Sequence, residues 1–338
     1  MQILENISLK SLNTFSIDVS ARYFSRFKTI DELQEILNWS KLKGLNPMIL
    51  GGGSNVLFTK NYDGLILKNE LIGIEKVKED DSFVYLKAGG GVVWHDFVMY
   101  CIKNNLSGIE NLALIPGCAG ASPMQNIGAY GVEVKDSFYE LTAMDKQTSQ
   151  AYKFSNSECE FGYRESVFKH KYKDRFVITD VTYRLSKTPH FKIEYGAIRQ
   201  QLEDDNVQEL SIAAIANVVI AIRTSKLPDP AVIGNAGSFF KNPSVPEEQF
   251  DLLKEKYPGI VGYKNTEGLV KVAAGWMIDR CGLKGFRRGD AGVHDKQALV
   301  LVNHGKATGN EILEISKIVR TAVFEKFGIE IVPEVNII

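Results

Sequence analysis

The sequence lacks the common signatures of metal, nucleic-acid and membrane chemistry. Its five histidines are scattered and form no His-Glu-x-x-His pair, so no metal site is expected. The formal net charge of −1 leaves no electrostatic footprint for nucleic acid or an anionic membrane. No apolar run approaches the roughly 20 residues that a membrane-spanning helix needs, and the N-terminus has neither the basic start nor the apolar run of a signal peptide. We therefore expect a cytoplasmic protein without a metal centre.

The spacing of the cysteines gives no indication of disulfide bonds. The four cysteines, Cys101, Cys118, Cys159 and Cys281, are widely spaced and form no Cys-x-x-Cys pair, so we expect reduced thiols in the core. Apolar residues make up 44% of the chain and charged residues 24%, which is typical of a globular protein. A length of 338 residues favours two or three domains.

The first two thirds of the chain alternate short strands and helices. Apolar runs bounded by glycine or charge predict strands, and apolar residues at helical spacing predict helices. The predicted strands are 47–50, 65–67, 83–86 and 176–183, and the predicted helices are 31–43, 94–102 and 209–225. The sequence Leu-Pro-Asp-Pro at 227–230 stops the last of these helices and marks a domain boundary.

Beyond this boundary the pattern changes. Segments 247–257 and 310–327 predict amphipathic helices, 297–303 predicts a buried strand, and 328–335 predicts a terminal strand interrupted by Pro333. Strands and helices follow one another without a regular βαβ rhythm. This mixed order predicts α+β domains and not a doubly wound sheet.

Two glycine-rich segments suggest a ligand that the backbone approaches closely. Residues 51–55 (Gly-Gly-Gly-Ser-Asn) follow a predicted strand, and their N–H groups can form an anion-binding nest, although a plain β-turn is an equal alternative. The Walker and Gly-x-Gly-x-x-Gly spacings are absent. In the second segment, 114–131, five of the six residues from Gly117 to Ser122 are small, which favours a buried loop pressed against a flat ligand. Together the two segments suggest a dinucleotide.

Ser238 lies in residues 234–243 (GNAGSFFKNP), between small residues and two phenylalanines, and is expected on a tight, partly buried turn. The segment is not the Gly-x-Ser-x-Gly elbow of a hydrolase, because Phe240 stands in place of the second glycine. A serine nucleophile also needs a histidine base, and His294 and His304 have no triad context. A serine hydrolase is therefore a weak alternative.

Five segments taken together resemble a known family. They are residues 51–55, 115–133, 162–166, 234–243 and 333–335, and they occur in the order seen in UDP-N-acetylenolpyruvoylglucosamine reductases, also called UDP-N-acetylmuramate dehydrogenases. The resemblance implies a two-part FAD-binding domain of the vanillyl-alcohol-oxidase (PCMH) type plus a C-terminal α+β substrate-binding domain. We place the FAD-binding domain at 1–224 with a split near 70, the substrate-binding domain at 225–328, and a returning C-terminal strand at 329–338.

The resemblance assigns three catalytic residues. It makes Ser238 the proton donor, and it makes Arg164 and Glu334 the residues that stabilise and polarise an enolpyruvyl carboxylate; without it, both charges would be interpreted as surface residues. These residue types suit the reaction because a hydride reaches the vinyl carbon only if negative charge builds up on the adjacent carboxylate. A guanidinium is always charged and grips a carboxylate in a fork. The resulting enolate then takes a proton from the serine hydroxyl.

The resemblance also implies FAD as the cofactor. The residues expected to bind it are Gly51, Gly52, Gly53, Ser54, Asn55, Pro116, Gly117, Gly120, Ala121, Ser122, Asn126 and Gly128. Non-covalent FAD is expected because residues 51–55 contain no histidine, while attachment through Cys118 stays open.

The residues expected to bind the UDP-sugar are Tyr195, Arg223, Lys226, Lys241, Asn242 and Gln297. Lys226 fits a diphosphate contact and a solvated lysine at a helix end equally well. Tyr195 and the Asp204-Asp205 insertion favour the type of this family in which a tyrosine loop folds over the UDP-sugar. One departure is Asn336, which stands where the family commonly has an arginine.

The function implied is NADPH-dependent reduction of UDP-N-acetylglucosamine enolpyruvate to UDP-N-acetylmuramate, a step of peptidoglycan synthesis that serves cell shape and division. The chain would be a monomeric flavoprotein whose partners are small molecules. NADPH and the UDP-sugar would share one cleft, because no separate Rossmann motif is present. The alternatives are an oxidase or dehydrogenase of the same flavin fold acting on an alcohol or hydroxy acid, and a module that only binds nucleotides.

Overall fold

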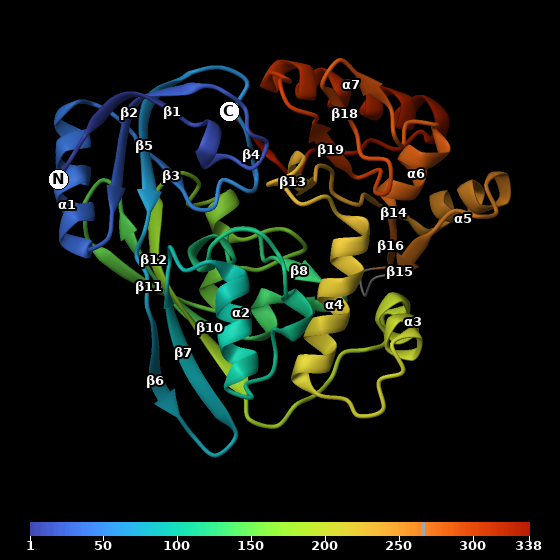
Figure 1. Ribbon diagram of the computed structural model, residues 1–338, viewed down its shortest axis with the longest axis horizontal. Helices are drawn as coiled ribbons and strands as arrows, with labels where there is room; N and C mark the ends of the chain where they lie inside the picture. Colours follow the sequence, from blue (N-terminus) through green and yellow to red (C-terminus); the bar gives the residue numbers. More distant parts are fainter. Residues whose placement is uncertain (265–267) are drawn as a thin grey trace. The chain divides into compact units, whose positions relative to one another are not determined.

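The computed structural model describes residues 1–264 and 268–338, and its backbone contacts divide the chain into two compact units (Figure 1). The first unit consists of Met1–Ile7, Ala21–Gly53 and Asp63–Ser225. The second consists of Ser8–Ser20, Ser54–Tyr62 and Lys226–Ile338. Two short segments from early in the chain are thus part of the unit that is built mainly from its C-terminal third.

The first unit begins with a four-stranded sheet. Its order is β1 (Leu4–Ser8), β2 (Ser20–Phe27), β5 (Tyr62–Asn69) and β3 (Met48–Leu50), with β3 parallel to β5. Helix α1 (Ile30–Leu42) packs on this sheet through Leu33, Ile36 and Leu37, and the hydroxyl of Thr29 accepts the N–H of Glu32 at its N-terminus. The predicted helix at 31–43 and the predicted strands at 47–50 and 65–67 are confirmed.

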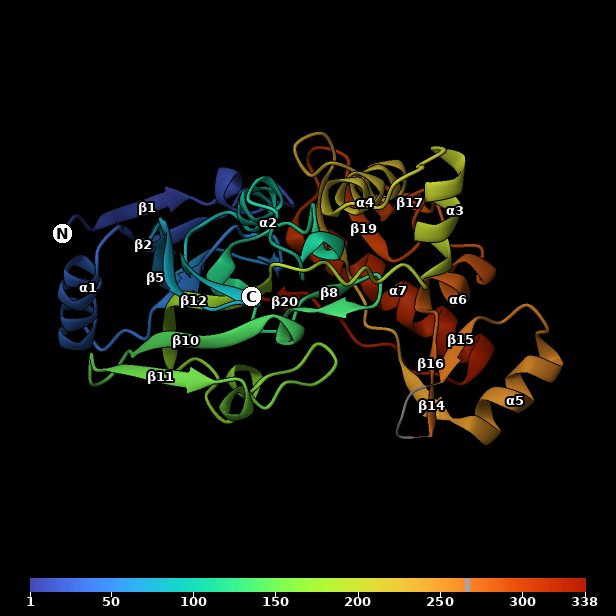
Figure 2. The ribbon, with the colours of Figure 1, turned by 90° about the horizontal axis from the view of Figure 1, so that it is seen from below.

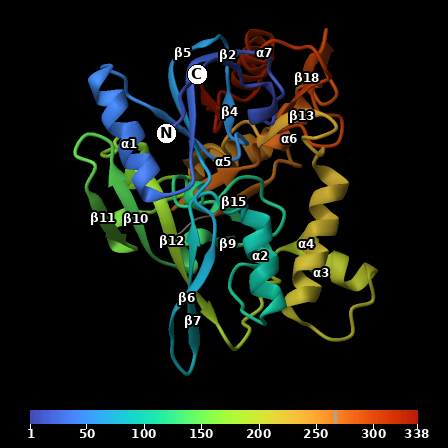
Figure 3. The ribbon, with the colours of Figure 1, turned by 60° about the vertical axis from the view of Figure 1, so that its left-hand side comes forward.

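A five-stranded antiparallel sheet forms the larger part of the first unit. Its order is β11 (Ala151–Ser155), β10 (Phe138–Asp145), β12 (Phe176–Ser186), β7 (Phe83–Gly89) and β6 (Ile74–Glu79). Helices α2 (Trp94–Lys103) and α4 (Ile212–Lys226) share one hydrophobic core with this sheet (Figure 3). The predicted strands at 83–86 and 176–183 and the helix at 94–102 are confirmed, and the helix predicted at 209–225 begins only at Ile212.

Smaller elements complete the first unit. They are helix α3 (Gly196–Asp204), the hairpin of β8 (Gly128–Ala129) and β9 (Val132–Glu133), and the 3₁₀ helices η2 (Glu110–Leu112), η3 (Ala119–Ala121), η4 (Val134–Asp136), η5 (Ser157–Cys159) and η6 (Val167–Lys169). The segment predicted as a small-residue loop, 114–131, therefore contains one turn of 3₁₀ helix, η3, and the short strand β8.

The second unit is built on two antiparallel sheets. The four-stranded sheet has the order β13 (Gly234–Ser238), β19 (Val300–Asn303), β18 (Ala291–Val293) and β17 (Arg287–Arg288). The three-stranded sheet has the order β14 (Ser244–Pro246), β16 (Leu269–Val272) and β15 (Gly262–Lys264), and helix α5 (Glu247–Lys256) lies beside it (Figure 2). Helices α6 (Ala274–Arg280) and α7 (Gly309–Phe327) share the core of this unit.

Helix α7 shows why some elements were predictable. A capping box of Thr308 and Glu311 begins it, and Gly328 ends it at a φ of 66°, a left-handed conformation that glycine adopts without strain. The helices predicted at 310–327 and 247–257 are confirmed. The strand predicted at 297–303 begins only at Val300, because Gln297 opens a turn that Val300 closes by donating its N–H to the Gln297 carbonyl.

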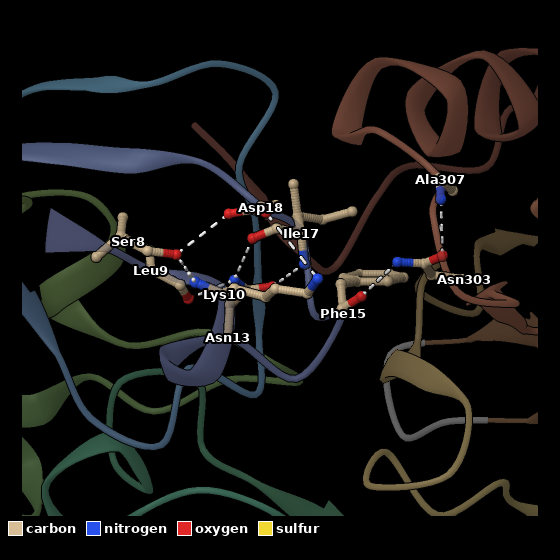
Figure 4. Close-up of polar contacts among 9 residues, drawn as sticks. All are labelled: Ser8, Leu9, Lys10, Asn13, Phe15, Ile17, Asp18, Asn303 and Ala307. Carbon is tan, nitrogen blue, oxygen red and sulfur yellow. Dashed lines mark hydrogen bonds and ion pairs between the residues drawn. The ribbon is translucent and has the colours of Figure 1, made fainter.

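The segment Ser8–Ser20 contains the 3₁₀ helix η1 (Lys10–Leu12); Asn13 folds it on itself and Asn303 anchors it in the second unit (Figure 4). Asn13 donates its amide to the carbonyls of Leu9 (2.7 Å) and Ile17 (3.0 Å). Asn303 donates to the Phe15 carbonyl at 2.8 Å and accepts the N–H groups of Gly305 and Ala307. The fully buried Phe15 ring then meets Phe239 edge to face, 6.3 Å away, so this early segment supports the strand that carries Ser238.

The four cysteines are free thiols, with Cys101, Cys118 and Cys159 buried and Cys281 half-buried. Within residues 1–264 and 268–338, no helix is long and apolar enough to cross a membrane. The same described residues contain no group of three or more histidine, cysteine or acidic side chains that could hold a metal ion.

Candidate functional site

Three glycine-rich segments of the first unit meet backbone against backbone. A Cβ atom on Gly52 would lie 2.9 Å from the Cα of Gly117, and one on Gly120 would lie 2.9 Å from the Cα of Gly90. Real Cβ atoms essentially never come so close. The two predicted segments, 51–53 and 117–120, are therefore brought together, and a third segment joins them.

This third segment, residues 89–91, was missed by the sequence reasoning. Added Cβ atoms would lie 2.6 Å from the Ile178 carbonyl oxygen at Gly90 and 2.8 Å from the Asn69 carbonyl oxygen at Gly91. The signal was present in the sequence, because this triple glycine comes two residues after the predicted strand 83–86, much as residues 51–53 follow the predicted strand 47–50. The N–H groups of Gly90 and Gly91 donate to the carbonyls of Thr179 and Leu71, and the Gly90 carbonyl accepts the Gly120 N–H, so the third segment holds the second one in place.

Two predicted cofactor residues use their side chains within the protein. The Ser122 hydroxyl lies 2.8 Å from that of Tyr183, and both residues are buried. Asn126 donates its amide to a Glu133 carboxylate oxygen (2.9 Å) and to the Gly162 carbonyl (3.0 Å), and it accepts the N–H of Lys135. Both side-chain N–H groups of Asn126 are thus used within the protein, whereas the Ser122 hydroxyl keeps capacity for a further hydrogen bond.

The predicted segment 51–55 is divided between the units. Gly51–Gly53 belong to the first unit, and Ser54 and Asn55 belong to the second. Within the second unit, Asn55 donates its amide to the Glu334 carbonyl at 3.4 Å and accepts two hydrogen bonds from Asn336 on its own carbonyl. Asn336, the departure from the family pattern, thus helps to fix the chain beside Glu334.

Arg164 is held rigidly in the first unit. Its guanidinium donates to the carbonyls of Gly128 (2.7 Å) and Asn126 (3.4 Å), and Asn126 in turn bonds to the Gly162 carbonyl two residues earlier. The residue has a φ of 57°, a left-handed conformation that is strained for a non-glycine residue. Strain of this kind persists only where the surroundings over-determine the backbone, and it is common at functional sites.

Arg223, Tyr130 and Tyr195 gather near Arg164 in the same unit. Burial lowers the pKa of Arg223, the charge of Arg164 lowers it further, and Tyr130 opposes both effects. The Tyr130 ring meets that of Tyr195 edge to face at 5.5 Å. Among the described residues, the buried Nε of Arg223 has no hydrogen-bond partner. A buried charged donor without a partner indicates a site for an acceptor that the chain itself does not supply.

Ser238 ends strand β13, whose pairing with β19 is irregular between Asn235 and Ser238. The expectation of a partly buried turn was wrong, because the chain buries Ala236 and Phe239 on either side and leaves the Ser238 side chain exposed. Gly237 supplies the bend with a φ of 69°. The hydroxyl is therefore presented at the surface by a strand that its neighbours hold in the core.

Glu334 lies on the chain segment next to Ser238. The Glu334 N–H donates to the Phe239 carbonyl at 2.7 Å, and Phe240 and Pro333 form an antiparallel bridge. The strand predicted at 328–335 is not formed, since the pairing there is this isolated bridge; the terminal strand is β20 (Asn336–Ile337), which runs parallel to β4 (Val56–Leu57). Pro333 explains the interruption because it has no N–H to donate.

The remaining predicted residues lie at element ends. The Asn242 side chain accepts the N–H of Ala274 at the start of α6 (2.9 Å), and the Lys241 N–H donates to the Val332 carbonyl. Gln297 is half-buried at the turn before β19, where its side-chain oxygen accepts the N–H of Leu299 at 3.4 Å. Lys226 is the exposed last residue of α4. Lys241 and Asn242 follow the strand of Ser238 after two buried phenylalanines, Phe239 and Phe240.

Comparison with known proteins identifies the family. The family model described as UDP-N-acetylenolpyruvoylglucosamine reductase, C-terminal domain, matches residues 229–338, and an FAD binding domain matches residues 21–151. UDP-N-acetylenolpyruvoylglucosamine reductase of Flavobacterium johnsoniae is 50% identical over the full length of both chains. The chain belongs to this family. The enzyme of the same name from Chromobacterium violaceum is 48% identical over 99% of this chain and 98% of its own. The resemblance of the five segments is confirmed, and the protein is an FAD-dependent oxidoreductase.

Solved structures show the same fold. The crystal structure of UDP-N-acetylenolpyruvylglucosamine reductase from Thermus caldophilus matches with a TM-score of 0.68 and 22% identity, covering 100% of this chain and 99% of that one. A 6-hydroxy-D-nicotine oxidase from Arthrobacter nicotinovorans matches with a TM-score of 0.50 and 13% identity, covering 97% and 86%. The predicted fold class, a flavin-binding α+β domain with a further C-terminal α+β domain, is confirmed.

Proposed function

We propose that the protein reduces UDP-N-acetylglucosamine enolpyruvate to UDP-N-acetylmuramate for peptidoglycan synthesis, with NADPH as the reductant of its flavin. The observation that carries the proposal is the pairing of the Ser238 strand with the Glu334 segment in a chain that matches reductases of this name along its whole length. We assign flavin binding to residues 1–224, substrate binding to 225–328 and a catalytic terminal segment to 329–338.

The glycine segments fit FAD. Backbone groups of Gly51–Gly53 and Gly117 would hold the pyrophosphate, and Gly120, whose own N–H donates to the Gly90 carbonyl, would line the ring system. When bound, FAD supplies the hydride that the vinyl carbon accepts. Burial raises the pKa of the Cys118 thiol, although Lys68 and the Gly52 N–H oppose the shift. A protonated thiol is a poor nucleophile, which favours FAD held without a covalent bond.

Three protein residues would stabilise the negative charge that develops on the substrate and supply the proton that completes the reaction. Arg164, fixed by two carbonyls, stabilises the negative charge that develops on the substrate carboxylate, and Glu334 polarises the same group. Addition of hydride to the terminal vinyl carbon makes a methyl group and leaves an enolate. The Ser238 hydroxyl gives its proton to the carbon that bears the ether oxygen, which completes the lactyl ether. No covalent bond between enzyme and substrate is formed.

Substrate binding is assigned to six residues. Arg223 offers its unpartnered Nε to an acceptor of the UDP-sugar, and Tyr195 covers the sugar as in the tyrosine-loop type of the family. Lys226 and Lys241 meet the diphosphate, while Asn242 and Gln297 meet polar groups of the sugar or base.

The test measures the two half-reactions separately under anaerobic conditions. NADPH should bleach the flavin, and the enolpyruvyl UDP-sugar should restore its colour. A Ser238→Ala variant should be bleached at the parent rate but reoxidised by the sugar about 10²–10⁴-fold more slowly, the usual contribution of a general acid. Ser244→Ala, another exposed serine of the second unit, is the matched control. Equal losses in both half-reactions would contradict the proton-donor role, and reoxidation by oxygen alone would favour an oxidase.

A further inference from the structure

Asn111 is a buried asparagine outside the predicted site. It lies in η2 and is 1% exposed. Its side-chain amide donates to the Tyr130 carbonyl at 3.1 Å and to the Lys192 carbonyl at 2.8 Å. Its side-chain oxygen is buried and has no hydrogen-bond partner in the described part of the chain.

This arrangement fixes what the side chain does. The two acceptors are carbonyls, so the amide must point its NH₂ group toward them and its oxygen away. Leaving a buried acceptor without a donor is unfavourable, and an apolar side chain would avoid that cost. The donor capacity of Asn111 is therefore the property that the fold uses. The adjacent Glu110 holds η2 in place by accepting the Ser107 hydroxyl (2.9 Å) and the Gly108 N–H (2.6 Å).

The two carbonyls belong to residues that are connected to Tyr195, one along the chain and one through a ring contact. Lys192 lies three residues before it, in residues 189–194, which form no helix or strand and so have no ladder of backbone hydrogen bonds to place them. Tyr130 meets the Tyr195 ring at 5.5 Å and interacts electrostatically with Arg223. Tyr130 also has a left-handed φ of 49°, a strained conformation that neighbouring contacts must maintain, and the hydrogen bond from Asn111 to its carbonyl is one of them.

We propose that Asn111 is a positioning residue for the nucleoside diphosphate sugar. Its amide ties the Tyr130 turn to the segment before Tyr195, so that the two tyrosine rings pack together and Tyr195 is preorganised to cover the substrate. Preorganisation of this kind lowers the ordering cost of binding and acts on affinity more than on the chemical step. The inference rests on the proposed role of Tyr195 in substrate binding.

The test compares Asn111→Asp with the parent. Aspartate keeps the shape but replaces both donors by an acceptor that faces two carbonyls. The KM for the enolpyruvyl UDP-sugar should rise about tenfold, the equivalent of roughly one lost net hydrogen bond, while kcat and flavin reduction by NADPH stay at the parent values. Asn156→Asp is the control for the change of side-chain type, because Asn156, although exposed, also donates one amide to two carbonyls, those of Lys135 and Phe138. Asn111→Ser serves as a milder second variant if Asn111→Asp folds poorly.

A double-mutant cycle with Tyr195→Ala separates the positioning role of Asn111 from the substrate-binding role of Tyr195. If Asn111 acts through Tyr195, Asn111→Asp should add nothing to the KM of Tyr195→Ala, whereas additive effects would overturn the inference. An increase in KM for Tyr195→Ala with a parent-like KM for Asn111→Asp also overturns it. If Tyr195→Ala leaves KM unchanged, the proposed substrate role fails instead. Hydrogen exchange of residues 189–195 then decides the positioning claim: faster exchange in Asn111→Asp supports it, and unchanged exchange refutes it.

Discussion

Replacing Gly120 by alanine should weaken flavin binding, and the structure gives the size of the effect. The added methyl group would lie 2.9 Å from both the Cα and the carbonyl oxygen of Gly90, about 0.5 Å short of the 3.4 Å at which ordinary contact begins. Gly90 is held in place, because its N–H donates to the Thr179 carbonyl at 2.7 Å and its carbonyl accepts the Gly120 N–H at 3.0 Å. Overpacking of this kind costs about 1–3 kcal/mol.

The cost should appear in the affinity for FAD if the glycine segments form the flavin site. A penalty of about 1–3 kcal/mol corresponds to a dissociation constant roughly 5- to 150-fold higher. Titration of the apoprotein with FAD, followed by quenching of flavin fluorescence, measures the constant directly. Thermal unfolding without FAD separates a loss of fold stability from a loss of binding.

Gly196→Ala is the control for this prediction. A Cβ on Gly196 meets nothing within 4 Å, and its φ lies outside the left-handed region, so alanine at the start of α3 should leave both FAD affinity and stability near the parent values. If Gly120→Ala binds FAD as tightly as the parent protein does, the close packing of the glycine segments has no part in the flavin site.

Three further predictions concern charge and anchoring. Burial lowers the pKa of Lys146 to about 8, so between about pH 8 and 10.5 the unfolded chain binds more protons than the folded protein and the free energy of unfolding should rise with pH. Lys146→Met should flatten this rise, measured by urea denaturation, and should stabilise the protein by about 1–3 kcal/mol at pH 7. An unchanged dependence of the unfolding free energy on pH would contradict the assignment. Arg164→Lys should slow reoxidation of reduced flavin by the sugar about 10²–10³-fold in stopped flow without changing flavin reduction, because lysine cannot keep the fork. Asn303→Ala should lower the free energy of unfolding by about 2–4 kcal/mol through three lost hydrogen bonds, whereas exposed Asn310→Ala should change it by less than about 0.5 kcal/mol; equal effects would argue against the anchoring role of Asn303.

The helices were predictable where local signals agree. Helix α7 combines apolar periodicity with a capping box and a glycine end, and α1 combines it with a threonine cap. The terminal segment failed because apolar, β-branched residues suggest a strand, while Pro333 removes the donor that pairing needs. Where propensity and hydrogen-bonding capacity disagree, the latter decides the structure.

The candidate site also has some features that the sequence predicts and others that depend on the fold. The motif around Ser238 pointed to its segment, but its exposure depends on which neighbours enter the core, and that is set by contacts with Phe15, more than two hundred residues away in the sequence. The third glycine segment was visible in the sequence and only needed the rule already applied to residues 51–53. Segment identity is thus local information, whereas side-chain exposure is not.

Asn111 marks the limit of sequence reasoning most clearly. Its partners lie 19 and 81 residues away, and both are backbone carbonyls, which any amino acid at those positions supplies. A pattern of side chains cannot predict such a contact, because the side chains of the partner residues take no part in it. The unpartnered side-chain oxygen is the physical sign that reveals it, since only the donor contacts explain a polar residue in that buried place. Residues that position a ligand through backbone acceptors are therefore to be sought among buried amides with one unsatisfied end, and Asn111 is the case that the proposed double-mutant cycle tests.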